Sequence, residues 1–332
     1  MRIAVAGLGF MGATHVKAIR SLSGVTLAAV CSSDEKKLAG DLSSVGGNIG
    51  AGERFDFSAI QRYRSLEELF RDPEIDAVDL CLPTYLHPSA AITALEAGKH
   101  VLVEKPFALD EASCGHMIDA ARSAGKVLMA AQVLRFFPSY QALMSALPEL
   151  GHVRSAVFRR RCAVPGWGDW LKDKSRSGGG VFDLLIHDVD MCLRLFGMPD
   201  SVSACGFEDL SAGIDLIDAR LHYGERFVAS VIGGWHPGAF PFSMEYAVVA
   251  SGGAVEYSSD GKAPTLYAAG GTQKLPLAEA DGYASEIAYF AECCRTGNAP
   301  DACTPEESAE AVRITRLMSA ARARNGERIS CK

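Results

Sequence analysis

Asp183, His187 and Asp190 are the polar residues whose spacing most directly suggests chemistry. They stand at i, i+4 and i+7 within 181–196, an otherwise apolar stretch, and so share one stripe of a predicted helix. Burying carboxylates and an imidazole is costly unless they find partners, and a cleft that faces a ligand would supply them. A hydrogen-bonded core group, the polar face of a surface helix and a metal site are the alternatives. We expect no metal, because one histidine with carboxylates on a single helix lacks the usual third ligand.

Lys105 is a second candidate for chemistry. It belongs to Glu104-Lys105-Pro106, which directly follows 101–103, a short apolar run that predicts a buried strand. A lysine at the carboxyl end of a parallel strand lies where α/β proteins bind their ligands. The alternative is a surface turn in which the proline ends the strand and the charges are solvated.

The glycine-rich segment 7–12, GLGFMG, matches the G-x-G-x-x-G pattern and lies between a predicted strand and a predicted helix. Gly7 would make the tight turn, Gly9 would let the backbone approach a pyrophosphate, and Gly12 would let helix and strand pack closely. The N-terminus of the helix would face the anion. The segment predicts a dinucleotide site, and a glycine-rich turn without a ligand is the alternative.

The end of the second predicted strand bears on the choice between NAD and NADP. Proteins that prefer NAD carry an acid there for the ribose hydroxyls, but this sequence has Cys31 followed by Ser32 and Ser33. Hydroxyls with a nearby cation such as Lys36 suit a 2′-phosphate, so the pattern favours NADP. Asp34 would reach the ribose of NAD if the strand ended later, and the lysine can equally be a solvated residue of a helix face.

Strands and helices alternate up to residue 131, as in an open, doubly wound parallel sheet. The strands expected are 2–7, 25–31, 76–82, 101–103 and 127–131, and the helices expected are 11–22, a short one capped at 65–68, 88–97 and 110–124. After Gly151 the pattern changes to long β-rich runs joined by tight turns, which predicts a mostly antiparallel sheet. Those runs are 152–163, 201–209, 213–223, 226–236 and 243–257, with helices at 181–196, 282–296 and 304–324.

We therefore predict an α/β protein with two domains. The first, 1–125, is a Rossmann domain that binds NAD or NADP. The second, 126–303, is an α+β domain built on the large, mostly antiparallel sheet. The C-terminal segment 304–332 forms a helix that we expect to pack back on the Rossmann domain.

The composition is that of an ordinary globular protein. The 332 residues carry a formal net charge of -7 without a long basic run, so we expect no nucleic-acid partner. The 10 cysteines include no C-x-x-C pair, and no apolar run is long enough for a membrane span or a signal peptide. We expect a cytoplasmic protein with reduced thiols and no membrane partner.

Together these motifs resemble the Gfo/Idh/MocA family of oxidoreductases, named after glucose-fructose oxidoreductase, inositol dehydrogenase and a rhizopine-catabolism protein. The resemblance rests on the glycine fingerprint, on 98–106 (GKHVLVEKP) and on 178–187, in which three glycines precede Asp183 and His187. It extends over essentially the whole chain. The segment 82–87 (LPTYLH) also fits, although Thr84 stands where asparagine is frequent.

The resemblance implies a Rossmann domain followed by an α/β domain whose open sheet often makes dimer or tetramer contacts, and a proline at 106 that is commonly cis. By motif position, the expected catalytic residues are Lys105, Asp183 and His187. The expected cofactor-binding residues are Gly7, Gly9, Phe10, Met11, Gly12, Ser32, Ser33, Lys36, Leu82, Pro83, Thr84, His87, Glu104 and Lys105. The expected substrate-binding residues are Lys105, Trp167, Trp170, Asp183 and His187.

The chemistry that the resemblance implies is reversible oxidation of a secondary alcohol on a sugar, polyol or cyclitol, with NAD or NADP as hydride carrier. We expect His187 to take the hydroxyl proton, because an imidazole titrates near neutral pH. Lys105 would stabilise the developing negative charge, and Asp183 would bind the substrate or orient the imidazole; Lys105 is the alternative base. Other members are NAD-dependent redox glycosidases or non-catalytic regulators, and the intact trio argues against a regulator.

A few other residues are candidates for contacts. Trp167 and Trp170 flank an acid in 165–172 and could stack on a sugar, as could Trp235, although core or interface packing is the alternative. Arg135 follows the last Rossmann strand and could contact cofactor, substrate or only the domain junction. The histidines without a recognisable constellation, which we expect to be structural or surface residues, are His15, His100, His116, His152 and His222.

Overall fold

The computed structural model describes residues 1–47, 52–166 and 168–332. They form two compact units, each assembled from three separate segments of the chain. The first unit comprises Met1–Val133, Pro165–Trp170 and Asp281–Ala309. The second unit comprises Leu134–Val164, Leu171–Ala280 and Glu310–Lys332.

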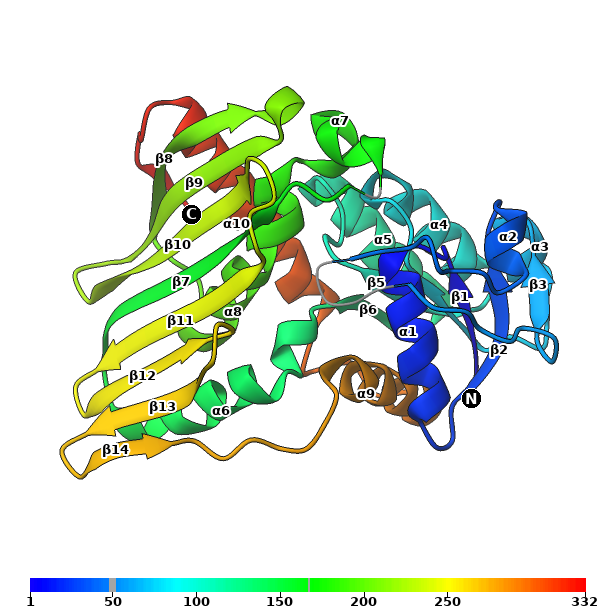
Figure 1. Cartoon of the computed structure of the whole chain (residues 1–332), viewed down its shortest axis with the longest axis horizontal. Helices are drawn as coiled ribbons and strands as arrows, with labels where there is room; N and C mark the ends of the chain where they lie inside the picture. The colour runs from blue at the N-terminus through cyan, green and yellow to red at the C-terminus, as the bar shows by residue number, and fades with distance from the viewer. Residues whose placement is uncertain (48–51, 167) are drawn as a thin grey trace. The chain divides into compact units, whose positions relative to one another are not determined.

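The first unit contains a 6-stranded sheet in which all neighbouring strands are parallel (Figure 1). The strand order is β3 (Gln61–Tyr63), β2 (Thr26–Cys31), β1 (Arg2–Ala6), β4 (Ala77–Leu80), β5 (His100–Glu104) and β6 (Leu128–Ala131). The central strands are almost entirely buried apolar runs, as expected for a parallel sheet covered by helices on both faces. The doubly wound sheet predicted from the sequence is confirmed. Its order reverses between β1 and β4, where sheets of this type bind ligands.

Several helices of the first unit begin at capping residues. The Ser65 hydroxyl accepts from the Glu68 N–H at 3.2 Å, as the predicted capping box requires. Asp110 caps a later helix in the same way, and Gly125 ends that helix with φ 62°. The helices are α1 (Phe10–Ser21), α2 (Glu35–Leu38), α3 (Leu66–Arg71), α4 (His87–Glu96), α5 (Glu111–Ala124) and α9 (Gly282–Thr296).

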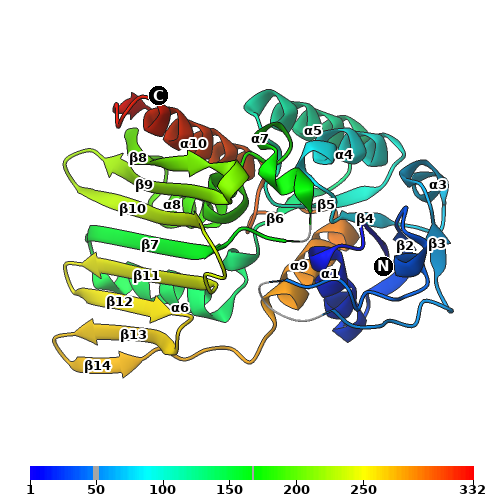
Figure 2. The ribbon, with the colours of Figure 1, turned by 45° about the horizontal axis from the view of Figure 1, so that its top comes forward.

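Helix α9 completes the core of the first unit, although it follows the second sheet in the sequence. Ile287, Phe290 and Cys293 are buried in the same apolar cluster as residues of β1, β2 and α1. Figures 1 and 2 both show α9 beside α1, with which it is in contact. The sequence prediction had placed 282–296 in the second domain, but its apolar face packs here.

The second unit contains a 9-stranded sheet that is antiparallel except between β7 and β10 (Figure 2). The strand order is β14 (Gly271–Lys274), β13 (Lys262–Ala268), β12 (Gly253–Ser258), β11 (Ser243–Ala250), β7 (Val153–Ala163), β10 (Phe227–His236), β9 (Ile214–Tyr223), β8 (Ser201–Asp209) and β15 (Ile329–Ser330). The mostly antiparallel sheet predicted from the sequence is confirmed. The expected run 243–257 is in fact two strands joined by a hairpin at Ser251 and Gly252. The sequence did not indicate β14, which is polar and exposed throughout.

Helices cover one face of the second sheet and leave apolar side chains on the other. The segment 181–196 contacts β7 and β10. Val249 pairs with Ala254, which pairs with Tyr267, so these three residues share one face of the sheet. Val249 is 44% exposed and Tyr267 37% exposed. The sheet is therefore open-faced, as the family resemblance implied.

Helix α10 (Pro305–Ala323) belongs to both units. Its first turn, to Ala309, groups with the first unit, and Glu310–Lys332 groups with the second. Strand β15 pairs with β8 in the second sheet. Of the segment 304–332, which the sequence predicted to pack on the Rossmann domain, only the first turn groups there. The rest is held by backbone pairing and by an arginine described below.

Helices α6 (Pro138–Ala146), α7 (Lys174–Ser177) and α8 (Ile186–Phe196) complete the second unit. Within the described ranges, no helix is both long enough and apolar enough to cross a membrane. All ten cysteines are free thiols.

Candidate active site

The turn between β1 and α1 contains three glycines, of which two are required by close packing within the fold and one is not. A Cβ atom at Gly7 would overlap the Cys81 carbonyl, and a Cβ atom at Gly12 would overlap the Gly7 carbonyl. Gly7 also has φ 95°, a conformation that favours glycine. Gly9 differs, since among the described residues beyond its chain neighbours no heavy atom lies within 4 Å of the position of its Cβ. The protein leaves open space at Gly9, which fits close approach of a ligand to the backbone.

Helix α1 starts at that open glycine. Gly9 is its N-cap, no side chain caps the helix, and its first turn contains no acidic residue. The N–H groups at a helix start bind anions well, and they do so best where no carboxylate competes. The residues present therefore fit the pyrophosphate of a dinucleotide.

The acid that follows the carboxyl end of β2, Asp34, binds backbone N–H groups close to it in sequence. Asp34 Oδ1 accepts from the N–H groups of Lys36 at 2.9 Å and Lys37 at 3.3 Å, and so caps α2. The Ser32 hydroxyl accepts from the Asp34 N–H at 3.1 Å. Ser33 and Lys36 are exposed. Hydroxyls and a lysine are thus accessible at this strand end, while the nearest carboxylate is engaged by a short helix.

His87, which we expected to bind the cofactor, is instead buried and contacts two backbone carbonyls. Its Nδ1 lies 2.8 Å from the Pro106 carbonyl, and its Nε2 lies 2.8 Å from the Leu82 carbonyl. Burial lowers the pKa of His87, although both carbonyls oppose that shift. With both nitrogens engaged and no exposed surface, His87 has no polar atom to offer a cofactor. It ties the segment after β4, where Thr84 is also buried, to the turn after β5.

The turn after β5 carries Lys105. The peptide bond between Lys105 and Pro106 is cis, as the family resemblance implied. The Lys105 N–H donates to Glu104 Oε2 at 2.9 Å. Lys105 thus follows the β5 end directly, at the edge of the sheet that also holds the glycine turn.

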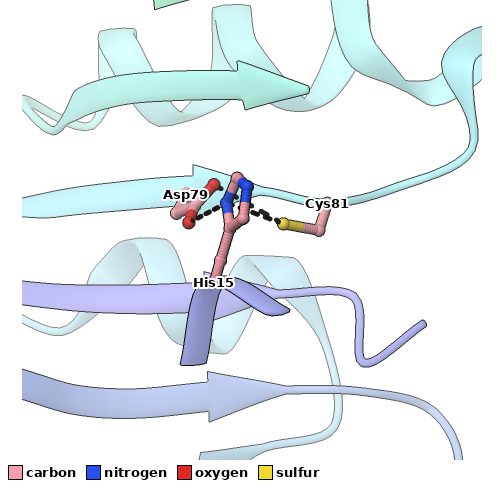
Figure 3. Close-up of side chains that lie close together, drawn as sticks. All are labelled: His15, Asp79 and Cys81. Carbon is pink, nitrogen blue, oxygen red and sulfur yellow. Dashed lines mark hydrogen bonds and ion pairs between the residues drawn. The ribbon is translucent and has the colours of Figure 1, made fainter. Parts of the chain in front are cut away.

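Glu104 is buried and forms an ion pair with His15, a residue to which the sequence analysis gave no partner. His15 Nε2 lies 3.2 Å from Glu104 Oε1, and His15 Nδ1 lies 2.8 Å from Asp79 Oδ2 (Figure 3). Burial alone would raise the pKa of Glu104, but the hydrogen bond and charge of His15 lower it. The signal for this cluster was present in the sequence, since Asp79 lies within a buried apolar strand and a carboxylate there requires a partner.

His15, Asp79 and Cys81 also lie close enough together to be considered as metal ligands. Their spacing is that of direct hydrogen bonding, with Cys81 Sγ 3.5 Å from both His15 Nδ1 and Asp79 Oδ1. Burial, and then the charge of Asp79, raises the pKa of Cys81, so the group is a neutral thiol. These residues form a hydrogen-bonded cluster, and a thiolate ligand for a metal is disfavoured.

The helix that carries Asp183 and His187 is not a regular α-helix. Val181–Leu185 is a π-helical turn, and α8 begins only at Ile186. The single α-helical stripe predicted for Asp183, His187 and Asp190 is therefore wrong, because a π-helix takes more residues per turn. Asp183 and His187 are nevertheless half-buried while every other residue from Val181 to Asp190 is buried. These two side chains are the ones that this segment presents outside its packed face.

The other two acids of the segment are buried in ion pairs within the second unit. Arg160 donates from Nε and Nη2 to Asp188 at 2.9 and 3.0 Å. Arg135 donates from Nε and Nη2 to Asp190 at 2.9 and 2.6 Å. Asp190 is thus part of the packing, and Arg135, left open by the sequence, is its partner. Both pairs are bidentate, the geometry that best offsets the cost of burying charge.

Three glycines before Val181 allow the helix start to pack tightly. A Cβ at Gly179 would meet the Asp215 carboxylate at 2.6 Å, and a Cβ at Gly180 would meet the Trp235 ring at 2.7 Å. Trp235 is fully buried, so the substrate contact considered for it is wrong and its ring is part of the core.

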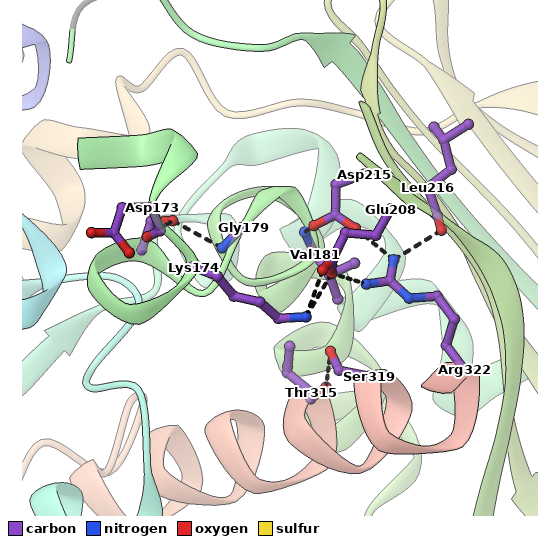
Figure 4. A network of polar contacts seen from close by, with 11 residues as sticks. Asp173, Lys174, Gly179, Val181, Glu208, Asp215, Leu216, Thr315, Ser319 and Arg322 are labelled. Atoms are coloured by element: carbon purple, nitrogen blue, oxygen red, sulfur yellow. Dashed lines mark hydrogen bonds and ion pairs between the residues drawn. The ribbon is translucent and has the colours of Figure 1, made fainter. Parts of the chain in front are cut away.

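Asp215 fixes the start of this helix in a polar network (Figure 4). Its Oδ2 accepts from the Val181 N–H at 3.1 Å, and its Oδ1 accepts from Arg322 of α10 at 2.5 Å. Arg322 also binds Glu208, which in turn binds Lys174 at 2.7 Å. The C-terminal helix thereby helps to set the position from which the segment of Asp183 and His187 begins.

The expected substrate-contact loop is described only in part. Trp167 lies outside the described residues. Trp170 is half-buried and belongs to Pro165–Trp170, which groups with the first unit.

The expected site residues divide between the two units. The glycine turn, the β2 end, the segment 82–87 and Lys105 belong to the first, whereas Asp183 and His187 belong to the second. Within each unit, the expected site residues of that unit have defined positions. That Lys105, Asp183 and His187 act together is part of the proposal below.

A parallel sheet of this order with an open glycine at an uncapped helix start defines a dinucleotide-binding protein. Comparison with known proteins agrees. Residues 1–132 match the model of an oxidoreductase family with an NAD-binding Rossmann fold, and residues 145–256 match the GFO/IDH/MocA C-terminal domain. The chain is an oxidoreductase and belongs to the Gfo/Idh/MocA family.

Two of the curated relatives carry names of sugar oxidoreductases. The chain is 31% identical over 242 residues to 1,5-anhydro-D-fructose reductase of Ensifer adhaerens, an alignment that covers 68% of this chain and 71% of the relative. It is 37% identical over 141 residues to D-glucoside 3-dehydrogenase of Escherichia coli, covering 41% of this chain and 40% of that protein.

Solved structures share the fold over the full length. A levoglucosan dehydrogenase in complex with NADH and levoglucosan matches with a TM-score of 0.85 at 18% identity, covering 99% of both chains. The aldose-aldose oxidoreductase of Caulobacter crescentus matches with a TM-score of 0.84 at 22% identity, also over 99% of both chains.

Proposed function

We propose that this protein transfers a hydride between a nicotinamide dinucleotide and a secondary alcohol or ketone of a sugar, polyol or cyclitol. The open space at Gly9, at an uncapped helix start in a sheet of Rossmann order, carries the proposal of a dinucleotide. The sugar class is supported by the relatives, which are named as a reductase of anhydrofructose and a dehydrogenase of glucosides.

The dinucleotide would be held by residues of the first unit. The N–H groups at the start of α1, including those of Phe10, Met11 and Gly12, would bind the pyrophosphate. The segment after β4, with Leu82 and Pro83, and the turn after β5 would adjoin the nicotinamide half. When bound, the nicotinamide supplies the hydride acceptor or donor.

The residues of this chain would handle the proton and the charge on oxygen. His187 takes the proton of the substrate hydroxyl as the carbon is oxidised, and returns it in the reverse direction. Lys105 donates a hydrogen bond to the same oxygen and stabilises its negative charge. Asp183 binds a substrate hydroxyl or orients the imidazole. Support comes from the half-buried setting of Asp183 and His187 among buried neighbours.

We propose NADP as the preferred cofactor. Ser32, Ser33 and Lys36 are available at the β2 end for a 2′-phosphate, and Asp34 is engaged as the cap of α2. The usual basis of NAD preference is an acid at the strand end that binds two ribose hydroxyls, and Cys31 occupies that position here.

We also propose that the open face of the second sheet joins copies of the chain into a dimer or tetramer. Phe207, 59% exposed, and Val249 are apolar side chains on strands of that sheet. Exposed apolar side chains on an open sheet face are typical of interfaces between copies of a chain. Sedimentation at increasing protein concentration tests it, and a monomer throughout would contradict it.

The test of function is turnover on a panel of inositols, hexoses and anhydro-sugars, followed by the absorbance of reduced nicotinamide. Replacing His187 by Ala should lower kcat by roughly 100-fold or more, the usual contribution of a general base. Lys105→Ala should cost about 100-fold. His222→Ala is the control, because this histidine belongs to the same unit as His187 and its Nε2 lies 2.9 Å from the Ser203 hydroxyl of a neighbouring strand. The turnover of this variant should be unchanged.

Near-wild-type turnover of both Lys105→Ala and His187→Ala would contradict these roles. Release of nitrophenol from a nitrophenyl glycoside without added cofactor would instead indicate a redox glycosidase.

A further inference from the structure

A buried cluster in the first unit joins three elements of the Rossmann fold. His15 comes from α1, Asp79 from β4 and Glu104 from β5, and their side chains are 0%, 1% and 7% exposed. His15 lies between the two carboxylates, 2.8 Å from Asp79 and 3.2 Å from Glu104 (Figure 3 shows the contact with Asp79). The imidazole is thus the link between the middle of β4 and the end of β5.

The charges of the cluster are defined by its geometry. Both ring nitrogens of His15 lie near carboxylate oxygens, Nδ1 in a hydrogen bond with Asp79 and Nε2 in an ion-pair contact with Glu104, and the imidazolium is the form that carries a proton on both. Burial alone would lower the pKa of His15, but the charge and hydrogen bond of Asp79 raise it well above its ordinary value. Two anionic carboxylates around one cation leave a net negative charge beside the Lys105 turn.

The remaining groups that face the imidazole are neutral or more distant. Cys81 is a thiol because burial raises its pKa. The Tyr283 ring of α9 lies 5.9 Å from that of His15, and burial, followed by the charge of Glu104, raises its pKa so that it remains a phenol. Glu286, also on α9, is buried near Tyr283 and adds a carboxyl group on that side. No cation from α9 therefore competes with His15 for Glu104.

The cluster is in contact with Lys105, the residue that the proposed reaction uses. One oxygen of Glu104 faces His15, and the other accepts the N–H of Lys105 at 2.9 Å. His15 lies three residues after Gly12 on α1, the helix whose start would face the pyrophosphate. A single side chain therefore connects the phosphate-binding helix with the turn that presents Lys105.

We propose that His15 is a positioning residue of the active site: it holds the Glu104 carboxylate against the Lys105 N–H and so fixes the orientation of Lys105 toward substrate and cofactor. This inference rests on the proposed function, in which Lys105 contacts the reacting oxygen. A purely structural histidine would stabilise the fold without affecting the chemistry at Lys105.

Two substitutions separate the two contacts of His15. In His15→Asn the amide can reach the position of Nδ1, so it keeps a hydrogen bond to Asp79 and loses Glu104. In His15→Gln the amide can reach the position of Nε2, so it restores a hydrogen bond to Glu104. We expect His15→Asn to lower kcat by about 100-fold, the cost of a small misplacement of a catalytic group, and His15→Gln to recover part of it.

The pH profile distinguishes positioning from folding. Without the His15 cation, burial raises the pKa of Glu104, so the loss of kcat in His15→Gln should grow toward about pH 6 and shrink toward about pH 9. His100→Gln is the matched control, because His100 is at the opposite end of β5 and its Nδ1 accepts from the Val127 N–H at 3.0 Å. An equal loss in both His15 variants, constant with pH, would overturn the proposal.

Binding measurements test the same inference without turnover. His15→Asn should weaken binding of NADP by about 10-fold while leaving binding of 2′-phospho-ADP-ribose, which lacks nicotinamide, unchanged. Equal weakening of both ligands, or of neither, would overturn the role of His15. Nitrogen NMR of histidine-labelled protein should show a doubly protonated His15 well above the ordinary histidine pKa, and a neutral ring at neutral pH would also overturn it. A wild-type protein that binds NADP in this way but oxidises no polyol or sugar would refute the proposed function alone.

Discussion

The buried ion pair between Arg160 and Asp188 gives a sharp stability prediction for the second unit. The two side chains are 3% and 0% exposed, and the guanidinium also donates to the Tyr140 hydroxyl at 3.1 Å. Arg160→Met would fill a similar volume but leave Asp188 buried without its cation. Removing one partner of such a pair costs about 3–5 kcal/mol. For a unit of this size that corresponds to a fall in melting temperature of roughly 6–20 °C.

Two further variants make this prediction specific. Arg159→Met removes the neighbouring guanidinium on β7, which is 43% exposed and pairs with Glu245. An exposed pair contributes at most about 1 kcal/mol, so this control should melt within a few degrees of wild type. The double variant Arg160→Met/Asp188→Leu should recover most of the lost stability, because an apolar pair of similar volume replaces a buried ion pair with little cost.

The assay is calorimetry of each variant across a range of pH. Burial raises the pKa of Asp188, with Arg160 opposing, so removing Arg160 raises it further. A carboxyl whose pKa is higher in the folded state binds protons on folding, and its contribution to stability falls as pH rises through that pKa. The deficit of Arg160→Met should therefore be smaller at acidic pH than at neutral pH. A deficit equal to that of Arg159→Met, or one that grows on acidification, would refute the reasoning.

The remaining predictions concern the turns and the cofactor. Gly12→Ala should destabilise the first unit by about 1–3 kcal/mol or more in thermal melts, because the added Cβ would overlap the Gly7 carbonyl. Gly9→Ala should melt at the same temperature as the wild-type protein but bind the dinucleotide more weakly in titrations. Asp215→Asn should lower kcat and melting temperature together, since it weakens the contact with Arg322 at the start of the segment that carries His187. Ser33→Asp should weaken NADP more than NAD through charge repulsion, and tighter NAD binding by the wild-type protein would contradict the NADP proposal.

The first sheet could be predicted because its signals are local. The central strands are short apolar runs, helices such as α3 and α5 follow a capping residue, and the glycine turn comes at the end of the first strand. The mostly antiparallel character of the second sheet was predicted, but its edge strand β14 (Gly271–Lys274) was not. This strand is polar and exposed, so its sequence has no alternation of apolar and polar residues. The place of α9 in the first core depends on contacts distant in sequence, which periodicity does not encode.

In the candidate site, too, features encoded by local sequence could be predicted, and contacts between residues distant in sequence could not. The positions of Lys105, Asp183 and His187 were named from motifs, whereas the π-helical turn at Val181–Leu185 was missed because helical spacing was assumed to be uniform. The partners of His15 lie on strands far along the chain. A buried acid in β4 is a sign that some partner exists, but it does not say which residue supplies it.

The division of each unit into three chain segments has a consequence for synthesis on the ribosome. The first unit acquires the buried side chains of α9 only after residue 293 has been made, when most of the chain has already emerged. Until then its parallel sheet lacks part of its core, with apolar surface near α1 exposed to other nascent chains and to chaperones. Neither unit can therefore finish folding early, because the first needs Asp281–Ala309 and the second needs Glu310–Lys332. A fragment ending at Val133 would lack the residues that complete the first unit.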